Sequence, residues 1–144
     1  MKIVICSSIH FVEKIRKVEM GLKERGHEVV IPHSINQFDV KNIEDDEKLR
    51  KIIQEKPNIK QELTIRHFDE IKGSDAILVV NDEKRGIPNY IGGATLSEML
   101  FALYHDKKIF MLNPIPTHER ISFYKDEIEG CQPIIINGNL DMVK

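Results

Sequence analysis

Five short apolar runs, separated by stretches with helical periodicity, are the feature that most constrains how this chain folds. The runs are KIVIC, EVVIP, AILVVN, KIFMLN and PIIIN, at residues 2–6, 28–32, 76–81, 108–113 and 133–137. Continuous apolar runs of this length are typical of strands that are buried on both faces of a sheet. Strands that alternate with helices predict an α/β fold with a parallel sheet.

Helical spacing and helix-ending residues place the elements between these strands. Val12, Ile15, Val18 and Leu22 recur on one helix face, and Gly26 follows as a stop signal. Further helices are expected over 44–56, 58–72 and 118–129, and another begins after Gly93 and is apolar over 99–104. Residues 33–43 and 82–91 are expected to be loops. We expect a single domain over 1–144. Its fold is expected to be flavodoxin-like and doubly wound, with right-handed crossovers, a five-stranded parallel sheet of order 2-1-3-4-5 and helices on both faces.

Charge and composition exclude several classes of function. The net charge is −2, which gives no electrostatic reason to expect a nucleic acid or a membrane as partner. No apolar run approaches the length of a membrane span, and no signal peptide precedes the first strand, so we expect a cytoplasmic protein. Cys6 and Cys131 form no CxxC motif, and Cys6 is expected to be a small core residue.

A ligand of this fold is expected at the carboxyl ends of the strands, near the switch point between the first and third strands. Polar and aromatic residues gather after three of the strands. The candidate binding residues are Ser7, Ser8, His10, Phe11, Asn81, Asp82, Asn89, Tyr90, Gly92, Gly93 and Asn113. Two simpler interpretations stay open, since Ser8 also suits a helix cap and the long loop before Gly92 also suits a solvated surface.

Glu98 is the candidate catalytic residue, in the segment GGATLSEMLFALY at 92–104. The apolar run over 99–104 predicts a buried helix, and a carboxylate that enters such a core needs a reason. A carboxylate there is able to attack the anomeric carbon of a sugar as a nucleophile. The same spacing also matches a capping box, in which Glu98 bonds back to the amide of Thr95.

The histidines lack the local spacing of a metal site. There is no HxH or HExxH motif, so neither a metal nor another cofactor is predicted. His67 is the histidine expected on a helix, 58–72, and directed toward the strand ends.

Four segments together resemble the nucleoside 2-deoxyribosyltransferase-like superfamily, which includes the 2′-deoxynucleoside 5′-phosphate N-hydrolases. They are KIVICSSIHF, RGHEVVIP, SDAILVVN and YIGGATLSEMLFALYHDKKIFMLNPIP, and they cover most of the chain. The last is the most specific, with a small-residue turn, a glutamate, an apolar helix and a turn into the next strand. The resemblance implies a flavodoxin-like fold and a homodimer or larger homo-oligomer.

The resemblance also implies a mechanism. Glu98 matches the glutamate that attacks C1′ of a deoxyribose, after which the base leaves and water or another base resolves the intermediate. Ser7 and Ser8 match the loop along the sugar and its 5′ end. Asn81 and Asp82 match a site for the sugar hydroxyls, and the Gly92–Gly93 turn matches one for a phosphate or hydroxyl. The substrate implied is a nucleoside or nucleotide.

This chain departs from the family pattern in the turn before the glutamate. Transferases often read DSGTAxE there, whereas this chain reads GGATLSE, with Gly92 and Ala94 in place of the acidic residue and the glycine. Ser7 also stands where many members have glycine. The alternative hypothesis is therefore a nucleotide-binding or signalling module without catalysis on the same fold, and a third is a scaffold in which Glu98 only caps a helix.

Overall fold

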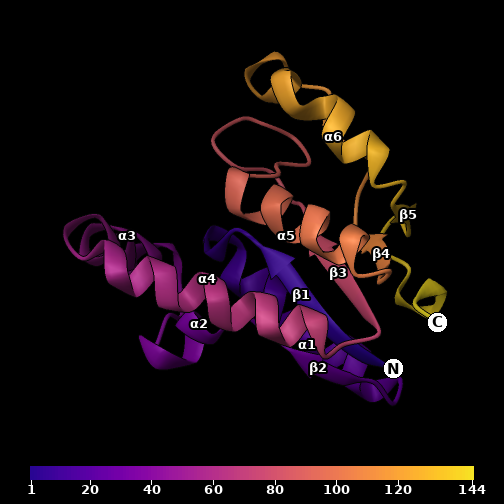
Figure 1. Cartoon of the computed structure of the whole chain (residues 1–144), viewed down its shortest axis with the longest axis horizontal. Helices are drawn as coiled ribbons and strands as arrows, with labels where there is room; N and C mark the ends of the chain where they lie inside the picture. Colours follow the sequence, from indigo (N-terminus) through magenta and orange to yellow (C-terminus); the bar gives the residue numbers. More distant parts are fainter.

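The computed structural model describes residues 1–144 and contains one five-stranded parallel sheet (Figure 1). The strands are β1 Lys2–Ser7, β2 Glu28–Val30, β3 Ala76–Val80, β4 Lys108–Met111 and β5 Ile134–Ile135. Their order is β2-β1-β3-β4-β5, with every neighbouring pair parallel, which confirms the predicted topology. β1 therefore lies between β2 and β3, at the switch point of the fold.

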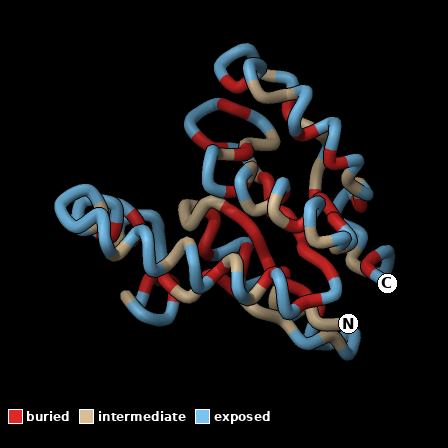
Figure 2. The backbone as a smooth tube through the Cα atoms, in the orientation of Figure 1, coloured by how far each residue is buried: buried red, intermediate tan, exposed pale blue.

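Helices cover both faces of the sheet. They are α1 Val12–Glu24, α2 His33–Gln37, α3 Ile43–Glu55, α4 Pro57–Lys72, α5 Gly93–Tyr104 and α6 Lys125–Gly130, with short 3₁₀-helices η1 Ile9–Phe11, η2 Glu119–Tyr124 and η3 Leu140–Met142. Figure 1 shows α4 and α5 over one face and α1 behind the sheet. Alternate residues of β1 face opposite cores, since Ile5 packs with α1 and Cys6 packs with α4 and α5. The strands form the buried centre of the molecule (Figure 2).

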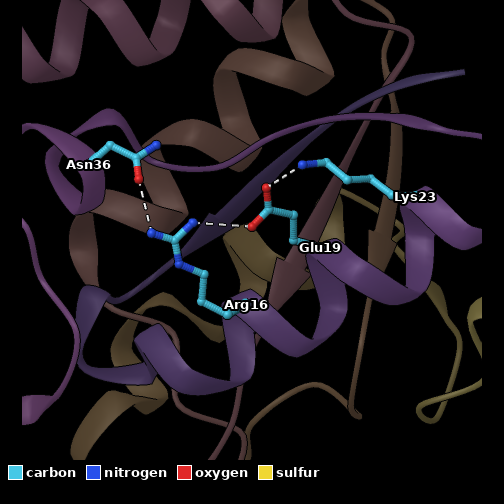
Figure 3. Close-up of polar contacts among 4 residues, drawn as sticks. All are labelled: Arg16, Glu19, Lys23 and Asn36. Atoms are coloured by element: carbon cyan, nitrogen blue, oxygen red, sulfur yellow. Dashed lines mark hydrogen bonds and ion pairs between the residues drawn. The ribbon is translucent and has the colours of Figure 1, made fainter.

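Residues 33–43 contain a helix where the sequence pattern predicted only a loop. α2 follows Pro32 directly, and its Ile35 is fully buried against the α1 side of the core. Arg16 on α1 donates to Asn36 Oδ1 over 2.9 Å and forms an ion pair with Glu19, so the side chains of α1 fasten α2 in place (Figure 3). A five-residue helix with one buried apolar side chain carries too little periodicity to be recognised in sequence.

Two further helix predictions are wrong in detail. The region 118–129 is not one α-helix, because Ile121 has a non-helical backbone (φ −125°, ψ 15°) that kinks η2, and only the short α6 that follows is α-helical. α5 is not buried all round, since Leu100, Leu103 and Tyr104 are exposed while Met99 and Ala102 face the sheet. No helix combines the length and the apolar character that crossing a membrane requires.

Candidate active site

A cavity of about 500 Å³ opens beside the carboxyl end of β1, within the size range of small-molecule sites. Its walls come from the loop after β1, the start of α5, the loop after β3, and side chains of α3 and α4. Six residues singled out from the sequence line it together: Ser7, Ser8, Tyr90, Gly92, Gly93 and Glu98. The location is the one that the switch-point rule predicts.

Glu98 lies in the second turn of α5 and is 15% exposed, toward this cavity. Its Oε2 lies 3.2 Å from His67 Nε2, and the same imidazole nitrogen lies 3.6 Å from Cys6 Sγ. α4 carries His67 over the end of β1, so three elements bring these side chains together. The arrangement puts a carboxylate in contact with both an imidazole and a thiol.

The capping-box interpretation of Glu98 is wrong. The helix begins at Gly93 with Gly92 as its N-cap, so Thr95 is already inside the first turn and its amide is not the N-cap amide. The hydroxyl of Ser97 donates to Gly93 O over 2.9 Å, and Glu98 makes no bond back to Thr95. Glu98 is therefore free of a capping role.

Cys6 is fully buried, as expected for a core residue. Burial raises the pKa of its thiol well above the usual value, and the negative charge of Glu98 and a hydrogen bond to that carboxylate raise it further. Donor atoms of Cys6, His67 and Glu98 lie within 4.8 Å of one another, a donor set known from zinc sites. A metal bound there would have to displace the proton of the Cys6 thiol, which the metal-free surroundings hold in place.

The loop after β1 is fixed by hydrogen bonds to its neighbours. Ser7 Oγ donates to the carbonyl oxygen of Val80 over 2.9 Å, which ties the end of β1 to the end of β3. Ser8 does not cap η1 with its side chain. Its Oγ instead accepts a hydrogen bond from Lys84 Nζ at 3.1 Å, so the interpretation of Ser8 as a simple cap is wrong.

Lys84 places a cation in the cavity wall, a residue that sequence analysis missed. It lies in a tight turn closed by two hydrogen bonds with Ile87, and this turn brings its ammonium back to β1. Lys84 is 8% exposed, has no carboxylate partner, and lies 4.9 Å from the centre of the Tyr90 ring. Burial, followed by the charge of Arg50, lowers the pKa of Lys84 to about 8, although Asp46 opposes that shift.

Other polar side chains around the cavity also escaped the sequence analysis. His33, Asp46, Arg50 and Lys60 line it from α2, α3 and α4. Asp46 is almost fully buried and accepts from Arg50 Nε over 3.2 Å. One signal was available, because the spacing of Asp46 and Arg50 places both on one face of a predicted helix. Nothing in the sequence indicated that this face turns toward β1.

The two glycines before α5 differ in what surrounds them. A Cβ on Gly92 would lie 3.2 Å from Tyr90 Oη, whereas a Cβ on Gly93 would meet nothing within 4 Å. Neither has a positive φ, so the turn does not need glycine for its backbone conformation. A side chain at Gly92 would thus make the Tyr90 side chain shift by a few tenths of an ångström, whereas Gly93 borders open space.

The remaining predicted binding residues lie outside the cavity lining. Asn81 is fully buried and exchanges hydrogen bonds with Asn113: its Oδ1 accepts from Asn113 N over 2.9 Å, and its Nδ2 donates to the carbonyl oxygens of Asn113 and Pro114. This pair joins the ends of β3 and β4. Phe11 belongs to the core on the α1 side.

Three more predicted binding residues lie in or beside the loops after β1 and β3 and do not line the cavity. The carbonyl oxygen of Asp82 accepts from the amide of Tyr90, which closes the loop after β3. Asn89 occupies a left-handed conformation (φ 54°), which asparagine tolerates in a turn. His10 packs edge-on against Phe11, and burial together with the charge of Lys84 lowers the pKa of His10.

Comparisons with known proteins show what this chain is similar to. No protein-family model matches the sequence, and no curated protein matches it. Among solved structures, the chain is similar to a 2-deoxyribosyltransferase from the psychrotolerant bacterium Bacillus psychrosaccharolyticus, with a TM-score of 0.56 and 17% sequence identity. The match covers 94% of this chain and 98% of that one. The chain therefore shares its fold, a flavodoxin-like sheet of order 2-1-3-4-5, with that 2-deoxyribosyltransferase.

Proposed function

We propose that this chain cleaves or transfers the N-glycosidic bond of a nucleoside or nucleotide, with Glu98 as the nucleophile. The observation that carries the proposal is a carboxylate in the cavity at the strand ends that takes no part in capping its helix. The neighbour of known structure supports the reaction class, since it is described as a biocatalyst for the synthesis of nucleosides.

The proposed reaction has two displacement steps. An oxygen of Glu98 forms a bond to C1′ of the sugar, and the C1′–N bond breaks with its electron pair going to the base. Water or a second base then attacks C1′, and the bond between sugar and Glu98 breaks to restore the carboxylate. Whether the acceptor is water or a second base, the proton that it loses neutralises the departed base. Two displacements at one carbon retain the configuration of the sugar.

The test is a chromatographic assay of base release from a panel of nucleosides, 2′-deoxynucleosides and their 5′-monophosphates. Glu98→Gln should lower kcat by roughly three orders of magnitude or more, because the amide is not nucleophilic. Glu127→Gln on α6, away from the cavity, is the matched control and should retain wild-type turnover. A sugar adduct on Glu98 in mass spectrometry would support the mechanism directly, whereas unchanged turnover in Glu98→Gln would refute it.

Binding without base release across the whole panel would favour the nucleotide-binding module instead. A ligand that binds the native state raises the melting temperature, so thermal shift measurements on the same panel detect this outcome.

We also propose that the chain forms a homodimer or larger homo-oligomer. Support comes from Leu100, Leu103 and Tyr104, three large side chains exposed on α5, the helix that carries Glu98. Exposed apolar side chains gathered on one element are typical of interaction surfaces. In analytical ultracentrifugation the wild type should sediment as an oligomer and Leu103→Glu as a smaller species, while a monomeric wild type at high concentration would contradict the proposal.

A further inference from the structure

We propose that His67 positions the nucleophile: its imidazole holds Oε2 of Glu98 and leaves Oε1 as the oxygen that attacks the sugar. The inference rests on the proposed function and adds a residue to it. His67 lies on α4 and Glu98 on α5, and their side chains meet beside Cys6 at the end of β1.

The two oxygens of Glu98 are not equivalent. Oε2 is closed off from solvent and lies 3.2 Å from His67 Nε2, although the pair is not aligned as a hydrogen bond in the unliganded site. Contacts of catalytic groups in unliganded sites are often poorly aligned and tighten only with substrate. Since Oε2 is enclosed, Oε1 is the oxygen that remains to meet a ligand in the cavity.

His67 is the only basic side chain within ion-pair distance of Glu98, with 3.2 Å between Nε2 and Oε2. Lys84 and Arg50 line the same cavity, but Lys84 contacts Ser8 and Arg50 is bound to Asp46. Removing the imidazole therefore leaves Glu98 without any cationic or N–H partner. The Cys6 thiol then remains as the donor beside this carboxylate, and a thiol is a weak donor. It compensates little for the burial of a carboxylate oxygen, so the side chain would move.

The protons of this cluster follow from its contacts. The burial of Cys6 and the charge of Glu98 keep the thiol protonated. With the carboxylate ionised, an Nε2 lone pair facing Oε2 would be repelled, so we place a proton on Nε2. Nε2–H then donates toward Oε2. His67 Nδ1 is buried and makes no hydrogen bond, so Nε2 is the nitrogen through which His67 acts.

This contact has a defined consequence in the reaction. When Oε1 bonds to C1′ and the base departs with the electron pair of the C1′–N bond, Oε2 becomes the carbonyl oxygen of the ester. It still faces Nε2–H, so the same imidazole holds the carboxyl group before and after the attack. No proton leaves His67 in either step. Because His67 acts on Glu98 and not on the substrate, it should affect kcat more than KM.

The kinetic test compares His67→Ala with His67→Gln. His67→Ala should lower kcat by roughly 10²-fold, the cost of a nucleophile displaced by about 1 Å, with little change in KM. His67→Gln offers an amide N–H and should recover much of that loss, which the loss of a merely structural side chain would not predict. His105→Gln, outside the cavity at the end of α5, is the matched control and should keep wild-type kinetics.

A second measurement does not depend on turnover. In ¹⁵N NMR of the histidine side chains, His67 should carry its proton on Nε2, and Glu98→Gln should shift the His67 signals while those of His105 stay unchanged. An unprotonated Nε2, or His67 signals that ignore Glu98→Gln, would overturn the inference.

The outcomes separate the two proposals. If the wild type is active and Glu98→Gln is inactive, but His67→Ala keeps its kcat, the role of His67 is refuted while the proposed function stands. If the wild type releases no base from any substrate of the panel, the proposed function fails. The NMR measurement then decides on its own whether His67 holds Oε2.

Discussion

The ammonium of Lys84 lies 3.1 Å from Ser8 Oγ, and this contact joins the loop after β3 to the loop after β1 across the mouth of the cavity. No carboxylate forms an ion pair with Lys84, and Arg50 and Arg85 add further positive charge near it. A buried ammonium without an anionic partner is unfavourable in the empty cavity. An anionic ligand group bound beside Ser8 would relieve that cost.

Replacing Lys84 should therefore change the affinity for nucleotides but not the affinity for nucleosides. Lys84→Gln is expected to weaken binding of a nucleoside 5′-monophosphate by roughly tenfold or more, the worth of a charge-assisted contact, and to leave binding of the matching nucleoside nearly unchanged. Isothermal titration with both ligands measures the difference. Arg85→Gln, an exposed neighbour outside the cavity lining, serves as control. Equal losses for both ligands would contradict an anion contact.

The same lysine predicts a pH dependence. The pKa of Lys84 is about 8, so its ammonium is charged below pH 8 and increasingly neutral above it. A phosphate monoester is already mostly dianionic at pH 7, so its own charge changes little over this range. Nucleotide affinity of the wild type should fall as pH rises from about 7 to 9, and the affinity of Lys84→Gln should stay flat. A parallel fall in both proteins would point to another group.

Asn81 should matter for stability. Its side chain makes three hydrogen bonds to the chain after β4, and it is fully buried. Asn81→Ala leaves those groups unpaired and should lower the free energy of unfolding by about 2–3 kcal/mol. Urea denaturation measures the loss, and Asn58→Ala, at an exposed position of α4, provides a comparison. A midpoint equal to that of the wild type would show that the two strand ends are held by other contacts.

The glycines before α5 should respond differently to alanine. Gly92→Ala forces the Tyr90 ring to move, because the new Cβ would lie 3.2 Å from its hydroxyl, and it also replaces a favourable N-cap. Gly93→Ala meets no atom and should raise the free energy of unfolding by up to about 1 kcal/mol, since alanine loses less entropy than glycine in a helix. Denaturant midpoints that move in the same direction would contradict this difference.

Neither cysteine should react in the folded protein. Burial raises the pKa of both thiols, and the reactive form is the thiolate. Iodoacetamide at pH 8 is therefore expected to leave Cys6 and Cys131 unmodified, and to alkylate both in urea. Intact-mass spectrometry counts the adducts. Rapid labelling of Cys6 under native conditions would show that the His67–Glu98 cluster opens to solvent.

The sheet was predictable because each strand has a local signal in the sequence, a short apolar run. Runs such as AILVVN at 76–81 are buried on both faces, and the order of strands follows from alternation with helices and right-handed crossovers. α2 was missed because its buried side chain, Ile35, depends on contacts with distant parts of the chain, and the kink at Ile121 interrupts a stretch whose pattern predicted one continuous helix. Short elements of this kind are decided by tertiary packing rather than by periodicity.

The candidate site was predictable only where residues follow a strand directly. Ser7, Ser8 and Glu98 fall at positions where the fold rule places a ligand. The contact between Glu98 and His67 could not be predicted, because the two residues lie on different helices far apart in the sequence. Lys84 reaches the cavity only because of the turn that it closes with Ile87. Asn81 has the residue type and location of a binding group, but its amide is used between strands.

The position of β1 between β2 and β3 determines when the cavity can form during synthesis. β1 is made early and pairs with β2 soon afterwards, yet its other neighbour, β3, follows only after α3 and α4. Until β3 is available, the edge of β1 that later pairs with β3 has no partner strand. Pairing of two strands that lie so far apart in the sequence is slow. The nascent chain thus exposes an unpaired edge of an apolar strand while it is still being extended. Expression at low temperature or with chaperones should improve its yield, because such edges recruit other chains.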